Sequence, residues 1–198
     1  MGEDGSWRHY TNSLQLSNLD CFMPDLEYYR WLVSPAGCEA IELATELLSK
    51  QGLVAATSGL RRVYTSSQTS AVLAQATLRQ RAKEKFTFAK RMFFTDVALQ
   101  QSSGEAISKY KSQRFFAGEN ILDLCCGIGG DLISLADRGP VVGVERDSVV
   151  ALLAEANCRA LHMNDAHVIN SDVTAHPVDD SLVHIDPDRR PGGKRTTA

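Results

Sequence analysis

Residues 120–131 read NILDLCCGIGGD and join a short apolar run to a turn rich in glycine. The isoleucine and leucine side chains of this run are typical of a strand that is buried on both faces. The glycines of the turn are Gly127, Gly129 and Gly130. They allow a tight backbone and the close approach of a ligand, and Asp131 then begins an apolar run of helical spacing. The stretch therefore predicts a strand, a ligand-binding turn and a helix.

Three similar runs follow it along the chain. They are residues 141–147 (VVGVERD), 167–172 (HVINSD) and 182–190 (LVHIDPDRR). Each is β-branched or leucine-rich, each reaches an acidic residue, and helical stretches separate them. This βαβαβ order predicts an α/β fold with a Rossmann-like, doubly wound parallel sheet. Its ligand contacts are expected at the carboxyl ends of the strands.

Acidic residues mark the ends of the later strands. Glu145 lies eighteen positions beyond Gly127, where a carboxylate can accept hydrogen bonds from both hydroxyls of a ribose. Asp172 follows the third strand and is placed for an adenine amino group. A dinucleotide loop would need a third glycine where this chain has Leu132, so a nicotinamide-dependent oxidoreductase is disfavoured but stays open.

Together, these motifs resemble those of class I S-adenosylmethionine-dependent methyltransferases over about residues 86–195. Within that class, DLCCGIGGD and DPDRRPGG are most similar to the trimethylguanosine synthase group and its bacterial relatives. The eukaryotic enzymes of that group have S-P-P-W-G-G at the fourth strand, where this chain has DPDR and no aromatic residue. The resemblance implies the fold and S-adenosyl-L-methionine as cofactor, but not cap hypermethylation.

The resemblance also implies a set of cofactor contacts. The residues are Asp123, Cys125, Gly127, Gly129, Gly130, Glu145, Arg146, Asp172, Phe94 and Thr95. The acid before the glycine turn and the turn itself would hold the methionine part, with Cys125 where many members have the first glycine. In this class the segment ahead of the first strand folds over the donor. We therefore expect Phe94 and Thr95 to line the pocket while the neighbouring aromatic residues pack in the core.

The turn Asp186-Pro187 is the predicted catalytic element. The Asp186 side chain and a backbone carbonyl of the turn can accept hydrogen bonds from an amino group and so aim its lone pair at the methyl carbon. Such a reaction needs alignment rather than a metal, and no metal site is expected. The alternative is that Asp186 only caps a loop at the end of a strand.

Basic residues suggest a polyanionic substrate. The predicted substrate contacts beside the catalytic turn are Arg189, Arg190, Lys194 and Arg195. A second group lies in residues 79–91, with six Lys or Arg and one Glu. Because neutralisation of phosphates supplies much of the affinity for nucleic acid, RNA is the expected partner. A solvated helix face is the alternative for residues 79–91.

The first part of the chain is organised as helices. One is predicted from Ser34-Pro35 to a stop at Gly52, a short one from the cap Thr57, and a longer one from Ser67 or Thr69 to Phe86. A further helical pattern after Ser103 ends near Gly118. We therefore expect an all-helical domain over residues 1–85, a connecting segment over 86–118 that packs on the cofactor site, and a cofactor-binding domain over 119–198.

Composition and cysteine usage indicate a globular protein of the cytoplasm. Hydrophobic residues make up 43% and charged residues 23%, the net charge is -3, and no run approaches the length of a membrane span or a secretory signal. The odd count of five cysteines without a CxxC pair favours reduced thiols over a zinc site or disulfides. The adjacent Cys125 and Cys126 are interpreted as small apolar residues rather than a redox pair.

The sequence stops at Ala198, directly after the fourth predicted strand, whereas class I methyltransferases generally have seven strands. We therefore expect a sheet truncated after the fourth strand and a fragment of a longer protein that binds cofactor weakly or methylates poorly alone. An open edge at residues 182–185 would favour self-association. The leading hypothesis is N-methylation of an exocyclic base amine in RNA. The alternatives are a non-catalytic cofactor- or RNA-binding module and a methyltransferase acting on protein or a small molecule.

Overall fold

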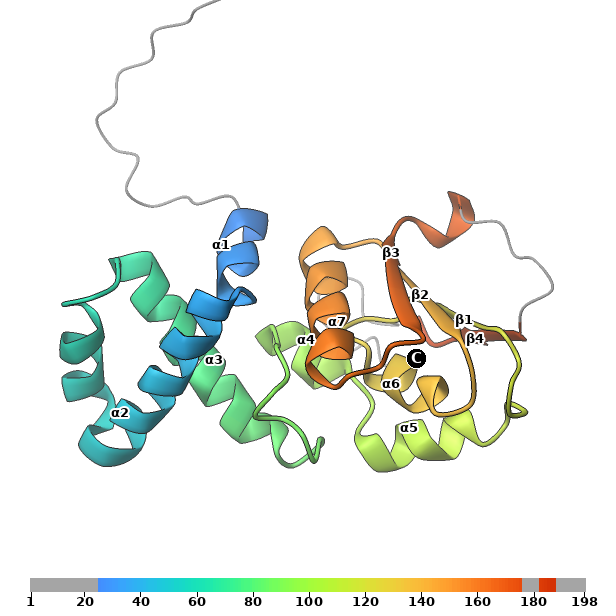
Figure 1. Ribbon diagram of the computed structural model, residues 1–198, viewed down its shortest axis with the longest axis horizontal. Coiled ribbons are helices and arrows are strands. Elements are labelled where there is room, and N and C mark those ends of the chain that lie inside the picture. Colours follow the sequence, from blue (N-terminus) through green and yellow to red (C-terminus); the bar gives the residue numbers. More distant parts are fainter. Residues whose placement is uncertain (1–24, 176–181, 188–198) are drawn as a thin grey trace, which may run out of the picture.

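The computed structural model describes residues 25–175 and 182–187. In chain order its elements are α1 (Asp25–Leu32), α2 (Pro35–Leu60), α3 (Ser66–Ala82), α4 (Asp96–Gln101), α5 (Glu105–Ser112), β1 (Ile121–Leu124), α6 (Gly130–Ala136), β2 (Val141–Glu145), α7 (Ser148–Ala160), β3 (Ala166–Asn170), the 3-10 helix η1 (Val173–Ala175) and β4 (Leu182–Ile185). In Figure 1, α1 to α3 form one end of the molecule and the sheet forms the other, with α4 and α7 between them.

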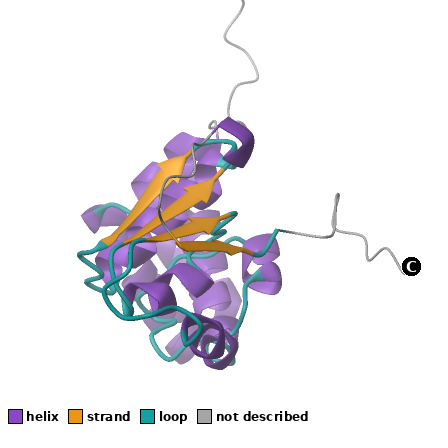
Figure 2. Ribbon diagram, turned by 90° about the vertical axis from the view of Figure 1, so that its right-hand side faces the viewer, coloured by secondary structure: helices purple, strands orange, loops and turns teal. Residues whose placement is uncertain are grey.

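The four strands form one parallel sheet in the order β3-β2-β1-β4. The chain enters the sheet at β1, builds outward through β2 and β3, and places β4 on the other side of β1. Figure 2 shows the strands lying side by side in one sheet. The order therefore reverses between β1 and β4, and ligands of such sheets bind at the carboxyl ends beside this reversal. The predicted α/β fold with a parallel sheet and a helical region before it is confirmed.

One face of the sheet is closed by α6 and α7. Ile121 of β1 and Val141 of β2 share a buried cluster with Leu132 of α6 and Ala154 of α7. Gly143 of β2 lets the glycine turn come close, because a Cβ there would lie only 2.8 Å from the sulfur of Cys126. A side chain at this position would push the glycine turn away from the strand.

The helical region departs from the sequence prediction at its caps. Gly52 breaks the helical backbone with φ 76°, as predicted, but α2 continues beyond it to Leu60. Thr57 lies inside this second part and donates its hydroxyl to the carbonyl of Leu53, so its predicted capping role is wrong. The next helix begins at Ser66, slightly before the predicted Ser67 or Thr69, because Thr65 and Gln68 form a reciprocal capping box.

The connecting segment also differs from the prediction. α4 was not predicted, and it forms because Thr95 accepts a hydrogen bond from the backbone of Ala98 at its start. α5 ends at Ser112 rather than near Gly118. A single hydrophobic cluster includes Leu32 and Phe86 as well as Ile128 of the glycine turn and Leu153 of α7. The helical region and the sheet region therefore share a core, and the proposed boundaries at 85 and 118 stay predictions.

Two buried amides hold the extended backbone at Phe93 and Phe94. Gln75 of α3 donates to the carbonyl of Phe94 and accepts from its amide, both at 2.9 Å. Asn157 of α7 makes the same pair of bonds with Phe93 and also donates to the carbonyl of Ile128 at 2.9 Å. Asn157 therefore ties the connecting segment to the turn that forms the site.

Replacing Asn157 with alanine is expected to lower the free energy of unfolding by about 3 kcal/mol. The side chain is fully buried, and its removal leaves backbone groups of Phe93 and Ile128 without partners. Chemical denaturation of the two proteins measures the effect, with the exposed Asn164→Ala as control. A loss no larger than that of the control would contradict this role for Asn157.

β4 forms one edge of the described sheet, where it pairs with β1 and presents apolar side chains to solvent. Val183 and Ile185 are 40% and 55% exposed. Self-association through this edge stays a prediction. Within residues 25–175 and 182–187, no helix combines the length and the apolar character needed to cross a membrane.

Candidate functional site

A cavity of about 1030 Å³ opens at the carboxyl ends of β1 and β2. Its walls come from the glycine turn, the residues after β2, β3 and β4, the start of α7 and the segment around α4. Tyr29 of α1 also reaches it, so the helical region contributes to the wall. The cavity lies beside the reversal of strand order, where the fold predicts ligand binding.

Most of the residues predicted from the sequence meet in this cavity. Those that line it are Asp123, Cys125, Gly127, Gly130, Glu145, Arg146, Asp172, Thr95, Asp186 and Pro187. They come from segments as far apart as α4 and the end of β4. The predicted substrate contacts Arg189, Arg190, Lys194 and Arg195 lie outside the described residues.

Two predicted cofactor residues do not line the cavity. Phe94 is fully buried, packs against Phe86 and has both of its backbone groups bonded to Gln75. The expectation that it lines the pocket is wrong because the buried amide turns this part of the chain into the core. Gly129 is the N-cap residue of α6, is buried and has φ 86°, so it shapes the turn rather than facing the cavity.

The glycine turn contains an unusual cysteine conformation. Cys125 has φ 66° and Gly127 has φ 57°, both in the left-handed region. A side chain in this region costs free energy that glycine avoids, so Cys125 adopts a backbone conformation that favours glycine. Burial is the main cause that raises the pKa of the Cys125 and Cys126 thiols, and Cys126 packs in the core. Both thiols are therefore poor nucleophiles at neutral pH.

Glu145 faces the cavity with a fixed carboxylate. One oxygen accepts from the backbone amide of Gly127 at 3.1 Å, and the other accepts from the amide of Asp147 at 2.8 Å. These bonds connect the end of β2 to the glycine turn. Each oxygen keeps further acceptor capacity, so the carboxylate is preorganised for a pair of hydroxyl donors.

Asp123 is a buried carboxyl at the base of the cavity. Its side chain is 2% exposed, and Oδ2 has no hydrogen-bond partner in the described chain. Burial is the main cause that raises the pKa of Asp123 to about 7, and the nearby Asp131 and Asp186 add to the effect. An unpartnered buried carboxyl is costly in its charged form. A cationic group entering the cavity would satisfy it.

Asp172 follows β3 and lines the cavity. Its Oδ1 accepts from the amide and the hydroxyl of Thr174 at 2.9 and 2.7 Å, so it caps η1. These bonds lower the pKa of Asp172. The residue is therefore ionised and held at the cavity wall, where it can accept from an amino group.

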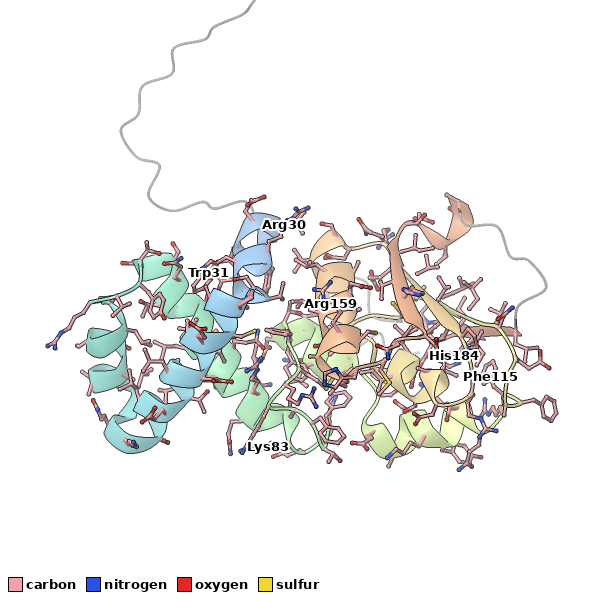
Figure 3. All side chains as sticks on the ribbon, in the orientation of Figure 1. Arg30, Trp31, Lys83, Phe115, Arg159 and His184 are labelled. Carbon is pink, nitrogen blue, oxygen red and sulfur yellow. The ribbon has the colours of Figure 1, made fainter. Side chains whose placement is uncertain are left out.

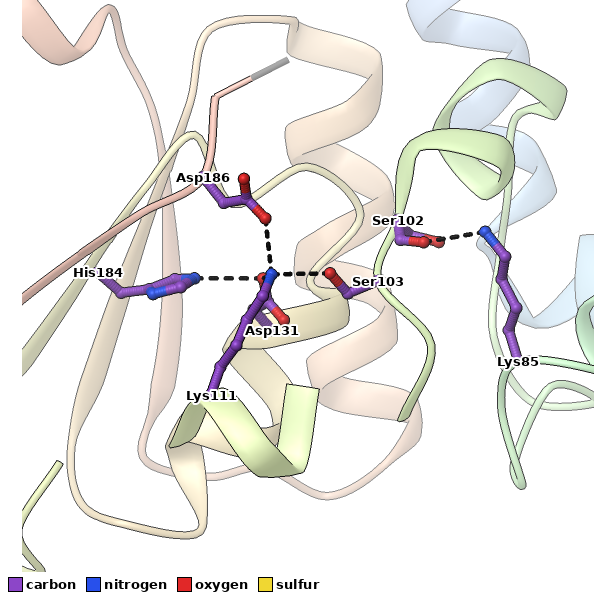
Figure 4. Close-up of polar contacts among 7 residues, drawn as sticks. All are labelled: Lys85, Ser102, Ser103, Lys111, Asp131, His184 and Asp186. Atoms are coloured by element: carbon purple, nitrogen blue, oxygen red, sulfur yellow. Dashed lines mark hydrogen bonds and ion pairs between the residues drawn. The ribbon is translucent and has the colours of Figure 1, made fainter. Parts of the chain in front are cut away.

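Asp186 belongs to an ionic cluster that the sequence did not reveal. Lys111 of α5 lies with its Nζ 2.6 Å from Asp186 Oδ2 and 2.7 Å from Asp131 Oδ2, and it donates to Ser103 at 2.8 Å (Figure 4). His184 donates through Nε2 to the same Asp131 oxygen at 3.2 Å. The sequence predicted Asp131 only as the start of a helix, and no local motif links it to Lys111 or Asp186.

The cluster shifts the ionisation of its members. Burial alone would lower the pKa of Lys111, but hydrogen bonds to Asp131 and Asp186 outweigh it and raise the pKa. Burial would likewise raise the pKa of Asp131, whereas bonds from His184 and Lys111 lower it to about 2. The bond to Asp131 raises the pKa of His184. The ring of His184 also meets Phe115 edge-on at 6.2 Å, and both residues are labelled in Figure 3.

The basic run over residues 79–91 is largely engaged within the molecule. Arg79 is half-buried and donates to a backbone carbonyl at 2.8 Å. Lys85 donates to three carbonyls at the end of α4. Arg91 donates to the carbonyl of Ala160 at the end of α7. These three residues donate hydrogen bonds to backbone carbonyls at helix ends and in turns. They therefore fit neither the predicted nucleic-acid surface nor the alternative of a solvated helix face.

Among the described residues, no group of three or more His, Cys, Asp or Glu side chains is arranged to hold a metal ion. The carboxyls of Asp123, Asp131 and Asp186 are close in space, but Lys111 stands between the last two. Asp131 and Asp186 therefore both bind the cationic side chain of Lys111.

Comparison with known proteins finds one matching family model and two curated relatives. A family model described as a domain of unknown function (DUF8688) matches residues 25–82, which coincide with α1 to α3. Two curated proteins are 38% identical over 104 residues, or 52% of this chain. Both are uncharacterized S-adenosylmethionine-dependent methyltransferases of Mycobacterium tuberculosis, from strains CDC 1551 / Oshkosh and H37Rv. The chain spans 28% of the length of these curated relatives.

Among solved structures, the chain is similar to a protein of Porphyromonas gingivalis W83 described as a "putative methyltransferase". The TM-score is 0.55 with 24% sequence identity, over 76% of this chain and 36% of that one. At this level of identity the likeness shows a shared fold.

Proposed function

We propose that this chain carries the donor site of an S-adenosylmethionine-dependent methyltransferase. The observation that carries the proposal is that two carboxylates, Asp123 and Glu145, line the cavity on either side of the glycine turn in the sequence. Asp123 offers an unpartnered buried oxygen for an ammonium group, and Glu145 offers a fixed carboxylate for two ribose hydroxyls. The curated relatives that share 38% identity over 104 residues carry the same activity in their names.

The cavity has the chemistry and the size for this donor. Asp123, Glu145 and Asp172 lie near the carboxyl ends of β1, β2 and β3 and would meet the methionine, ribose and adenine parts in that order. Arg146 and the start of α7 complete the adenosine side. A cavity of about 1030 Å³ is at the upper end of small-molecule sites, which leaves space for an acceptor next to the donor. When bound, S-adenosylmethionine would supply an activated methyl group that passes in line to the acceptor while S-adenosylhomocysteine leaves.

The acceptor we propose is an exocyclic amine of an RNA base. The Asp186-Pro187 turn lines the same cavity as the donor residues, and the half-exposed carboxylate can accept a hydrogen bond from an amino group. The basic residues at 189, 190, 194 and 195 in the sequence support a polyanionic acceptor. The basic residues within 79–91 give less support to an RNA acceptor than the sequence suggested, because several of them form hydrogen bonds within the molecule. A cytoplasmic location accords with this substrate and with the cysteine usage.

The oxidoreductase alternative has less support from the site. Leu132 occupies the place of a third dinucleotide glycine, and its fully buried side chain packs under Gly143. The helix therefore cannot pack against the strand as closely as it does in a dinucleotide-binding loop, where a third glycine stands at this position. The non-catalytic module and the protein or small-molecule acceptor stay as outcomes of the test below.

Calorimetric titration with S-adenosylmethionine and, separately, NAD tests the donor. We expect binding of the first and none of the second, and the reverse result would favour the oxidoreductase. Incubation with methyl-labelled donor and total RNA, followed by filter binding, tests the acceptor. Label on protein but not on RNA would indicate that the acceptor is a protein. Donor binding with no labelled acceptor, and RNA binding unchanged in Asp186→Ala, would favour the non-catalytic module.

A further inference from the structure

The end of β4 is held to the rest of the site by two separate bonds. His184 lies on β4 itself and donates to Asp131, while Lys111 links Asp131 to Asp186, two residues beyond His184. Asp131 directly follows Gly130 of the turn that lines the donor cavity. The acceptor turn and the donor turn therefore share one anchoring carboxylate.

Lys111 occupies the centre of this arrangement. Its ammonium has three N–H donors, and the three acceptors at 2.6, 2.7 and 2.8 Å are Asp186, Asp131 and Ser103. The side chain is 18% exposed, so these bonds are shielded from much of the competition with water. Figure 4 shows the ammonium between the two carboxylates, with the other oxygen of Asp186 pointing away from it.

Without such a tether, Asp186 would have freedom to rotate. Its side chain is 46% exposed at the end of an edge strand, where a carboxylate normally samples several rotamers. A group that must align an acceptor benefits from a single orientation, because misplacement by about 1 Å can cost roughly 100-fold in rate. The bond from Lys111 occupies one oxygen and leaves the other for an acceptor.

We propose that Lys111 is a positioning residue that orients the Asp186 carboxylate relative to the bound methyl donor. This inference rests on the proposed function for the role of Asp186, but its structural part does not. Lys111 acts from α5, which lies 75 residues before Asp186 and packs against α6. The connecting segment thereby supplies a functional group to the acceptor side of the site.

The experiment compares Lys111→Met, which removes the charge but keeps the stem, with Lys111→Arg, which keeps the charge. Lys109→Met is the matched control, because Lys109 lies on the same helix and pairs with Glu105 at the surface. At saturating donor, we expect methyl transfer by Lys111→Met to fall roughly 30- to 100-fold, with donor affinity changed less than about threefold. Lys111→Arg should recover part of the rate, and the control should match the unmodified protein.

Two further measurements do not depend on activity. Crystals should show Asp186 in the orientation of Figure 4 in the unmodified chain and displaced or in several conformers in Lys111→Met. Nuclear magnetic resonance should show a higher pKa for His184 in that variant, because the nearby cation that lowers it is gone. An unmoved Asp186, or a transfer rate within threefold of the unmodified protein, would overturn the inference. Absence of donor binding and transfer in every protein, with Asp186 displaced as expected, would instead overturn the proposed function alone.

Discussion

Replacing Glu145 with alanine is expected to weaken S-adenosylmethionine binding by roughly 100-fold or more. The carboxylate would accept both ribose hydroxyls, and each charge-assisted bond contributes about 1.5 to 3 kcal/mol. The substitution also frees the amides of Gly127 and Asp147, which loosens the glycine turn. Calorimetry measures the change in dissociation constant.

The control for this prediction is Glu119→Ala, since Glu119 is exposed and does not line the cavity. Circular dichroism should show that both variants keep their secondary structure. Donor affinity of Glu145→Ala within about threefold of the unmodified protein would remove Glu145 from the binding site, because a pair of ribose bonds cannot be so weak.

Donor affinity is also expected to depend on pH through Asp123. Its pKa of about 7 means that the carboxyl is largely protonated at pH 6 and largely ionised at pH 8. Only the ionised form can pair with the ammonium of the methionine part, so affinity should rise about tenfold over this interval. Asp123→Asn should abolish the pH dependence and weaken binding at pH 8 by roughly 30-fold or more. Calorimetry at a series of pH values measures both effects, and Asp165→Asn serves as the exposed control.

The same carboxyl has the opposite effect on stability without ligand. The folded-state pKa of Asp123 lies above its ordinary value of 3.8, so the proton binds more tightly to the folded chain. The associated stability is fully present below about pH 4 and is lost as the pH rises to about 7. Relative to the unmodified protein, Asp123→Asn should therefore gain about 3 kcal/mol between pH 5 and pH 8. A constant difference across this range would show that Asp123 is ionised throughout.

The strands and the donor side of the site could be predicted because their signals are local. A short apolar run, a glycine turn and an acid at the next strand end follow one another in the sequence, and the structure brings them to one cavity. The helix stop predicted at Gly52 corresponds to a left-handed break in the helical backbone, which glycine favours, but α2 continues beyond it.

The errors concern residues whose environment is set by distant parts of the chain. Phe94 was placed in the pocket because it precedes the first strand, but the amide of Gln75 holds its backbone in the core. Lys85 was counted as surface charge, although it binds carbonyls at the end of α4. The partnership of Lys111 and Asp186 joins residues 75 positions apart, and no local pattern records it.

The most direct test of the donor site is a crystal structure of this chain with S-adenosylhomocysteine. We predict that the Glu145 carboxylate accepts from both ribose hydroxyls while the ligand's ammonium lies beside Asp123. A ligand bound outside the cavity, or one with its ribose away from Glu145, would contradict the account.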